Sequence, residues 1–130
     1  MSSIFSKIVS GDMPAFKVAE NDDHLAFLDI FPLEKGHVLV IPKKETDYIF
    51  DINSDEYLQL WKFAYKVAKG MDKVIACKRV GVAVIGLEVP HAHIHLVPLN
   101  KVSDINFERP KLKFSEVEMQ SVADLIKSAI

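Results

Sequence analysis

The chain has 130 residues, of which 49% are hydrophobic and 26% charged, and this balance predicts one folded domain over residues 1–130. The formal net charge of −2 provides no broadly basic surface, so DNA and RNA are not expected as partners. A single cysteine, Cys77, excludes an internal disulfide and a cysteine-rich zinc site. We see no signal sequence and no apolar run of the roughly 20 residues that span a bilayer, so we expect a cytoplasmic protein without membrane contact.

A short helix and three strands are predicted in the first part of the chain. Apolar residues at helical spacing predict a helix that begins near Ile4 and is ended by Gly11. Alternating or apolar runs at 16–20, 24–30 and 37–41 predict three strands, each bounded by turn residues. Strands joined by such short turns pair as antiparallel neighbours, so we expect a meander.

The clearest helix is predicted to begin at the possible cap Ser54-Asp55-Glu56 and to end at about Gly70. Apolar residues recur within it at the spacing of one buried helix face. Trp61 is expected to anchor that face in the core. The nearly all-apolar run at 80–85 predicts a buried strand. The predicted buried face of the helix consists of Tyr57, Leu60, Trp61, Ala64, Val67 and Ala68.

A further helix is predicted near the C-terminus. Ser115 and Glu118 have the spacing of a capping box, which predicts a helix over about 115–129. The order of elements predicts an α+β fold, with an antiparallel β-sheet of about five strands, a central amphipathic helix and a C-terminal helix. The residues of the last helix expected to face inward are Val122, Leu125 and Ile126.

Three of the five histidines, His91, His93 and His95, occupy alternate positions of one apolar run. Alternate side chains of a β-strand point to the same face, so we expect the three imidazoles to line one face. The residues between them would pack on the other face. Titratable groups gathered in this way typically mark a functional site.

The histidines could simply lie on a solvated strand face without a function. Two chemical interpretations are possible as well. A metal could be bound, but three ligands along one straight strand rarely converge, so Glu88 or His37 would have to complete the site. Alternatively, a neutral imidazole could attack phosphorus while its other nitrogen donates a fixed hydrogen bond. A second, protonated imidazole would then neutralise charge on a phosphoryl oxygen.

The chain resembles the histidine triad (HIT) superfamily of nucleotide hydrolases and transferases, and most closely its histidine triad nucleotide-binding branch. Four sequence blocks carry the resemblance, and they follow the family's order. They are residues 4–11 with Pro14, 25–30 with Pro32, 36–43, and His91-Ala92-His93-Ile94-His95-Leu96-Val97, which together span most of residues 3–98. Residues 99–130 form a C-terminal extension outside the resemblance. A HIT-like fold is therefore expected.

The resemblance implies a phosphoramidase-like hydrolase of purine nucleotides or nucleoside phosphoramidates, which forms homodimers by joining sheets and needs no metal or other cofactor. His93 would attack the α-phosphate and form a nucleotidyl-histidine that water hydrolyses. His95 would hold a non-bridging phosphate oxygen, while His91 and His37 would orient the catalytic group. Asp29 would bind the ribose hydroxyls. The apolar slot for the base would comprise Ile4, Phe5, Ile8, Phe27 and Ile30.

The segment before the triad departs from the family's usual Gly-Gln-Ser/Thr-Val. Here Gly86, Leu87 and Glu88 would lie at the substrate, but Leu87 has no hydrogen-bond donor and an ionised Glu88 would repel phosphate. Glu88 could instead be protonated and act as an acid, or point away. Leu99 replaces the arginine typical of the dinucleoside polyphosphate branch. A nucleotide-binding regulatory protein with weakened catalysis therefore stays an alternative, and a metal-binding protein a further one.

Overall fold

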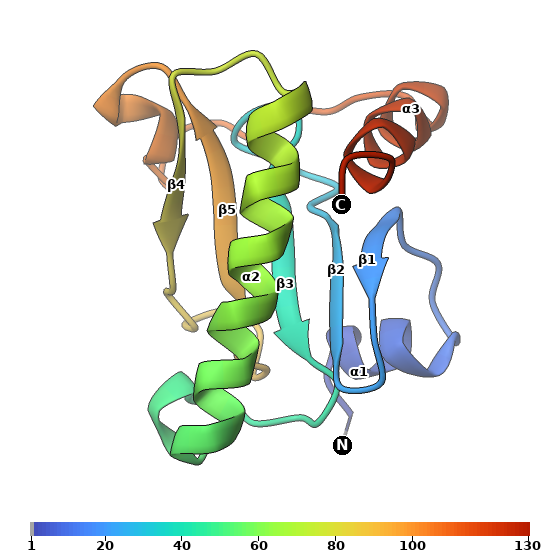
Figure 1. Cartoon of the computed structure of the whole chain (residues 1–130), viewed down its shortest axis with the longest axis vertical. Coiled ribbons are helices and arrows are strands. Elements are labelled where there is room, and N and C mark those ends of the chain that lie inside the picture. Colours follow the sequence, from blue (N-terminus) through green and yellow to red (C-terminus); the bar gives the residue numbers. More distant parts are fainter. Residues whose placement is uncertain (1) are drawn as a thin grey trace.

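A computed structural model describes residues 2–130, and in this part of the chain five strands form one antiparallel sheet with the order β1-β2-β3-β5-β4 (Figure 1). The α+β fold expected from the sequence is thus confirmed. The helices are α1 (Ile4–Ser10), α2 (Ser54–Val74) and α3 (Glu116–Lys127), and two 3-10 turns are η1 (Ile49–Asp51) and η2 (Val102–Ile105). The strands are β1 (Lys17–Glu20), β2 (His24–Leu28), β3 (Val38–Pro42), β4 (Arg79–Ala83) and β5 (Ile94–Leu99).

The predicted meander forms the first half of the sheet. Strands β1, β2 and β3 pair in chain order, with Phe27 opposite Leu39 in the β2–β3 ladder. After α2 crosses the sheet, β5 pairs with β3, placing His95 opposite Leu39. Strand β4 pairs with the outer side of β5 and forms the edge.

Helices cover both faces of the sheet, and each face has its own apolar core. Helices α2 and α3 pack on one face, where Leu60 and Val67 contribute to a large cluster with Val40 and other alternate strand residues. On the opposite face α1 packs Phe5 and Ile8 against Phe27, Leu39 and their neighbours. Because His95 pairs with Leu39 and shares its face, the histidines lie on the α1 side, away from α2.

The boundaries of α2 differ from the prediction at both ends. Asn53 is the N-cap, and its side-chain oxygen accepts a 2.9 Å hydrogen bond from the backbone of Glu56. At the other end the helix continues past Gly70 to Val74. Gly70 lies inside the helix and serves packing there: a Cβ atom at this position would lie 2.6 Å from Cγ1 of Ile130.

The C-terminal helix follows its prediction with one exception. Ser115 and Glu118 form the expected capping box, and Val122 and Ile126 are buried. Leu125, expected to face inward, is 45% exposed. In α2, Trp61 is only partly buried, so it packs at the margin of the core rather than at its centre.

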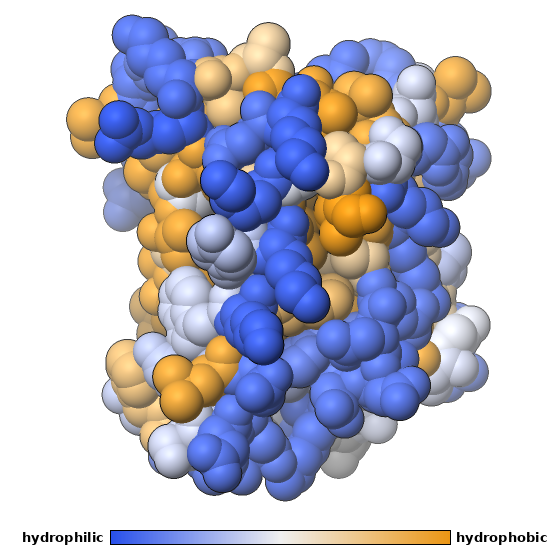
Figure 2. Space-filling model, viewed as in Figure 1, coloured by the Kyte–Doolittle hydropathy of each residue, from blue (hydrophilic) through white to orange (hydrophobic). Residues whose placement is uncertain are grey.

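Polar and apolar residues are unevenly distributed on the α2 side of the molecule. Figure 2 shows hydrophilic residues over most of this face, with apolar surface in the groove between α2 and α3 and along the edge near β4. Among residues 2–130, no helix has the length and apolarity that crossing a membrane requires.

Candidate active site

The three alternate histidines do not all belong to one strand. Strand β5 begins only at Ile94, so His95 is in the sheet while His91 and His93 lie in the irregular segment before it. In this segment the amide of Ala92 donates a 2.7 Å hydrogen bond to the carbonyl of Thr46, which lies beyond the end of β3. The prediction of a single histidine strand is corrected accordingly. The imidazoles are nevertheless brought together, with 4.8 Å between the ring centroids of His93 and His95.

The hydrogen bond of His93 leaves one of its ring nitrogens free. Its Nδ1 lies 2.7 Å from the carbonyl oxygen of His91, and because a carbonyl only accepts, Nδ1 must carry the proton and donate. Burial lowers the pKa of His93, although the hydrogen bond to His91 opposes this. At neutral pH the ring is therefore neutral with the lone pair on Nε2, the form in which an imidazole is nucleophilic.

A chain of hydrogen bonds also sets the protons on His37 and His95. The backbone amide of Leu33 donates to Nδ1 of His37 at 3.1 Å, so the proton of neutral His37 is on Nε2. This Nε2 in turn lies 3.0 Å from Nδ1 of His95, to which it donates. His95 therefore presents an N–H at Nε2, a donor suited to an oxygen of a phosphate.

Both of these imidazoles are uncharged at neutral pH. Burial is the main cause that lowers the pKa of His37 to about 3 and the pKa of His95 to about 3. The expectation of a protonated second imidazole beside the nucleophile is thus wrong for the unliganded protein. A positive charge that offsets the negative charge of a bound phosphate would therefore have to come from a group other than His37 and His95.

His91 is held by a network that begins on α1. Its Nε2 donates to the carbonyl of Pro42 at 2.8 Å, which leaves Nδ1 to accept from the hydroxyl of Ser3 at 2.8 Å. Ser3 is also the N-cap of α1, and its amide donates to Glu45 Oε1 at 2.6 Å. Ser6 donates to the same oxygen at 2.7 Å. The hydrogen bonds from Ser3 and Ser6 hold the pKa of Glu45 down at about 2.

Asp29 lies beside His37, with 3.9 Å between Oδ2 and Nε2. Burial raises the pKa of Asp29, while the amide of Phe31, which donates to Oδ1 at 2.9 Å, acts in the opposite direction. The carboxylate keeps a free oxygen close to the histidines. It is therefore placed to accept hydrogen bonds from hydroxyl groups of a ligand.

Asp29, His37 and His95 also bring three potential metal-ligand atoms within 4.8 Å of one another. A neutral histidine that binds a metal through Nε2 must carry its proton on Nδ1. Nδ1 of His37 instead accepts from the Leu33 amide. Binding a metal here would break that buried hydrogen bond, which argues against His37 as a ligand.

The residues expected to contact the base divide into two groups. Phe5, Ile8 and Phe27 are buried together, and the ring of Phe5 meets His93 edge-on with 5.0 Å between centroids. In contrast, Ile4 is 45% and Ile30 54% exposed. The buried group supports the rings from behind, whereas the exposed isoleucines are available to a ligand at the surface.

The segment before the histidines turns at Gly86, whose φ of 72° is in the left-handed region that favours glycine. Leu87 is 87% exposed and Glu88 is exposed. The charge of Glu88 is near enough to act on His93 and Asp29. It raises the pKa of both, so it opposes the effect of burial at His93 and adds to it at Asp29. Glu88 thus belongs to the surroundings of the site, while the structure leaves Leu87 facing solvent.

Comparison with known proteins decides the family. The HIT domain matches residues 10–102 of the chain. The chain belongs to the HIT family. This HIT protein is 34% identical over 133 residues to adenosine 5'-monophosphoramidase hnt1 of Schizosaccharomyces pombe, covering 100% of this chain and 99% of that protein.

The solved structures that share the fold of this HIT protein include two that cover nearly the whole chain. One is a Hit-like protein of Bartonella henselae described as involved in cell-cycle regulation, with a TM-score of 0.86, 27% identity, and coverage of 99% and 97% of the two chains. The other is a zinc-bound histidine triad family protein of Mycobacterium smegmatis, with a TM-score of 0.81, 27% identity, and coverage of 99% and 93%.

The structure of this HIT protein adds site residues that the sequence analysis did not identify. Phe107, in the C-terminal extension, meets the ring of His95 edge-on with 4.6 Å between centroids. The charge of Lys111 acts on Asp29, His37 and His95. Ser3 and Glu45 support His91. Only Ser3 had a signal in the sequence, as a serine directly before a predicted helix.

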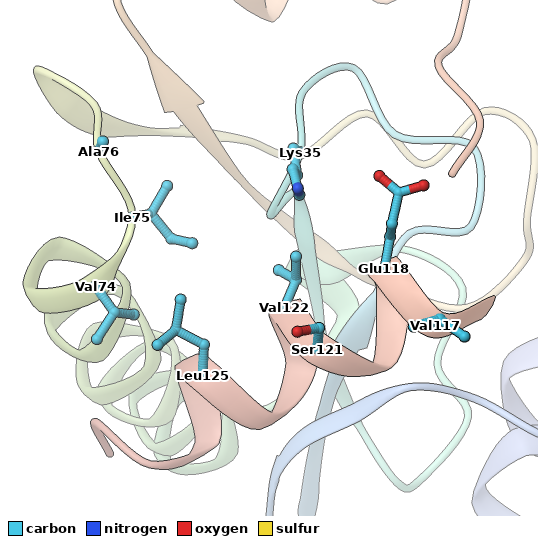
Figure 3. Close-up of a pocket in the computed structure, with 9 residues that line it drawn as sticks. All are labelled: Lys35, Val74, Ile75, Ala76, Val117, Glu118, Ser121, Val122 and Leu125. Carbon is cyan, nitrogen blue, oxygen red and sulfur yellow. The ribbon is translucent and has the colours of Figure 1, made fainter. Parts of the chain in front are cut away.

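The groove between α3 and the end of α2 is separate from the histidines. Its cavity of about 470 Å³ is shown in Figure 3, where Val122 and Leu125 face Val74 and Ile75, with Lys35 and Glu118 nearby. None of the candidate site residues lines it. The groove therefore has no evident part in the chemistry of the histidines.

Proposed function

We propose that this HIT protein hydrolyses nucleoside phosphoramidates, and related nucleotides, at the α-phosphate through His93. The observation that carries the proposal is the 2.7 Å hydrogen bond from Nδ1 of His93 to the carbonyl of His91, because it puts the proton on Nδ1 and leaves the lone pair on Nε2 for attack. The likeness to a phosphoramidase of Schizosaccharomyces pombe supports the substrate class.

The reaction would proceed in two displacements. Nε2 of His93 would form a bond to phosphorus as the bond to the leaving amine breaks, and the amine would take a proton from solvent. Water would then cleave the nucleotidyl-histidine and release the nucleoside monophosphate. The N–H at Nε2 of His95 would donate to a non-bridging oxygen in both steps, which is the electrostatic stabilisation that phosphoryl transfer needs.

The other residues would position the substrate and the rings. His37 would keep the proton of His95 on Nε2, and His91 would offer its carbonyl to His93. Asp29 would accept from the ribose hydroxyls. A purine base would lie at the surface near Ile4 and Ile30, with Phe5, Ile8 and Phe27 behind it.

Independence from metal and a dimeric state are parts of the same proposal. The Leu33–His37 hydrogen bond supports a reaction without a metal at this cluster. A homodimer is supported by the edge strand β4, where Val82 is exposed, and by the adjoining groove of about 660 Å³ between α2 and β4. The cytoplasmic location stays a prediction.

Exposure of Leu87 favours a second candidate, a regulatory protein that binds nucleotides with weakened catalysis. A side chain that is 87% exposed and has no donor cannot assist a phosphate or leaving group. In that case the wild type would bind a nucleotide without turning over a phosphoramidate.

His93→Asn tests the proposal, because the amide of asparagine can still donate to the carbonyl of His91 but offers no ring nitrogen for attack. With fluorogenic adenosine and guanosine phosphoramidates, we expect the variant to lose at least about a thousandfold in kcat, while its Tm stays near that of the wild type. A nucleotidyl adduct should appear on the wild type alone in rapid-quench mass spectrometry. A wild type that is inert, yet whose Tm rises with AMP, would establish the regulatory alternative.

A further inference from the structure

The C-terminal extension is fastened across the candidate site by its own contacts. Arg109 donates through one guanidinium nitrogen to the carbonyls of Leu33, at 2.6 Å, and Asp104, at 2.9 Å, and pairs with Glu34 at 3.4 Å. The amide of Leu112 donates to the carbonyl of Pro32 at 2.9 Å. These contacts hold the segment 107–112 against the loop that follows Asp29.

This placement brings an aromatic ring and a cation to the histidines. The ring of Phe107 lies 4.6 Å from that of His95 and 6.3 Å from that of His37, measured between centroids. Nζ of Lys111 donates to the backbone carbonyl of Phe107 and, at 3.4 Å, to that of Arg109. The ammonium of Lys111 is thus hydrogen-bonded to Phe107, the residue whose ring packs against that of His95.

The charges of Lys111 and Glu88 both act on Asp29, but they act on different histidines. Burial dominates the lowered pKa of His37 and His95, and the charge of Lys111 contributes to both, whereas Glu88 contributes at His93. Lys111 is therefore near His37 and His95, and its hydrogen bond to the carbonyl of Phe107 places it at the residue whose ring meets that of His95. Arg109 is committed to carbonyls and a carboxylate, but Lys111 is exposed and bonded only to carbonyls of its own segment among the described residues. It can turn to an anion at little cost.

We propose that Lys111 binds the α-phosphate beside His95, under the ring of Phe107, and supplies the positive charge that the neutral imidazoles lack. This inference rests on the proposed function, whose substrate carries that phosphate. A cation next to a partly buried phosphate acts more strongly than one in open water, and the half-buried ring of Phe107 would displace solvent from this phosphate. Lys111 would also compensate for the donors that Leu87 and Glu88 do not provide.

Binding of AMP and of uncharged adenosine, measured by titration calorimetry, tests the role of Lys111. We expect Lys111→Met to weaken AMP binding about tenfold, with a smaller salt dependence, and to leave adenosine binding unchanged. Lys111→Arg should retain most of the affinity for AMP. Lys113→Met removes an exposed lysine two residues further on and serves as the matched control, with both affinities expected to equal those of the wild type.

Equal AMP affinities of Lys111→Met and wild type would overturn the inference, as would an equal loss for AMP and adenosine, which would indicate only a structural role. Turnover separates this result from the proposed function. If AMP binding depends on Lys111 but the wild type releases no AMP from a phosphoramidate, the inference stands and the hydrolase proposal fails. A wild type that does not bind AMP would refute the inference about Lys111, while the hydrolase proposal would still be decided by the turnover of a phosphoramidate.

Discussion

The hydroxyl of Ser3 lies 2.8 Å from Nδ1 of His91, a residue 88 positions away in the chain. The same hydroxyl accepts from the amide of Ser6 and so caps α1. One side chain thus fixes both the start of a helix and the orientation of a histidine. Since the carbonyl of His91 accepts from His93, the position of α1 is coupled to the proposed nucleophile.

Ser3→Ala should lower the free energy of unfolding by roughly 2 kcal/mol, because α1 loses its cap and a buried ring nitrogen loses its partner. Urea unfolding at neutral pH measures the change. Ser10→Ala, at the exposed end of the same helix, is the control and should change the stability by less than about 0.5 kcal/mol. Equal stabilities of the two variants would show that the Ser3–His91 contact contributes nothing.

Glu88→Gln should improve the binding of anionic substrates. The exposed carboxylate acts on His93, and its negative charge opposes an incoming phosphate. We expect KM to fall about threefold at low salt, and less at high salt, where charges are screened. Glu108→Gln, an exposed carboxylate on the extension, is the control. A loss of kcat confined to substrates with amine leaving groups would instead identify Glu88 as the general acid.

The stability of the protein should fall as the pH drops below about 6.5, the usual pKa of an unfolded histidine. His37 and His95 have a pKa of about 3 when folded, so between these values the unfolded chain binds more protons than the folded protein. Above about 6.5 their contribution is complete and constant. Each histidine adds a slope of at most about 1.4 kcal/mol per pH unit.

His95→Asn tests this assignment, because its amide oxygen can replace Nδ1 as the acceptor for His37. Urea unfolding at pH 7, 6 and 5 should show a shallower decline for the variant, by up to about 1.4 kcal/mol per unit. The raised pKa of Asp29 acts in the opposite sense in both proteins and cancels in the comparison. Identical slopes would mean that His95 is not held neutral.

Gly70→Ala should stabilise the protein more when Ile130 is shortened than when it is not. Alanine favours an interior helix position by about 1 kcal/mol over glycine, but its Cβ would lie 2.6 Å from Cγ1 of Ile130. In an Ile130→Ala background we expect that gain in full, and in the native background a smaller one or none. Thermal and urea unfolding of the four proteins of this double-mutant cycle measure the difference. A gain of the same size in both backgrounds would rule out the contact.

Local signals predicted the elements of this fold well where the determinants were local. The Ser115–Glu118 capping box and the turn at Gly11 were sufficient to locate helix ends. Gly70 misled the prediction because its role is tertiary: it accommodates the chain end at Ile130. Leu125 fitted the apolar periodicity of α3 but lies at the open groove, so it stays exposed.

The candidate site was predictable to the extent that it lies in the four blocks of the resemblance. His37, Asp29 and the three alternate histidines do come together in space. Their protons could not be predicted, since these depend on backbone groups such as the amide of Leu33. The position of Phe107 at His95 could not be predicted either, because it results from contacts that Arg109 makes with a loop distant in the sequence.

The tautomers of this site trace back to main-chain atoms: the amide at position 33 and the carbonyls at positions 42 and 91. Replacing side chains other than His37, whose Nε2 donates to His95, cannot reverse such a proton arrangement as long as the backbone keeps its course. Substitutions around the site would therefore change which ligands it can bind before they changed which imidazole nitrogen reacts. Displacement of a loop by an ångström would be more harmful to the chemistry than many substitutions.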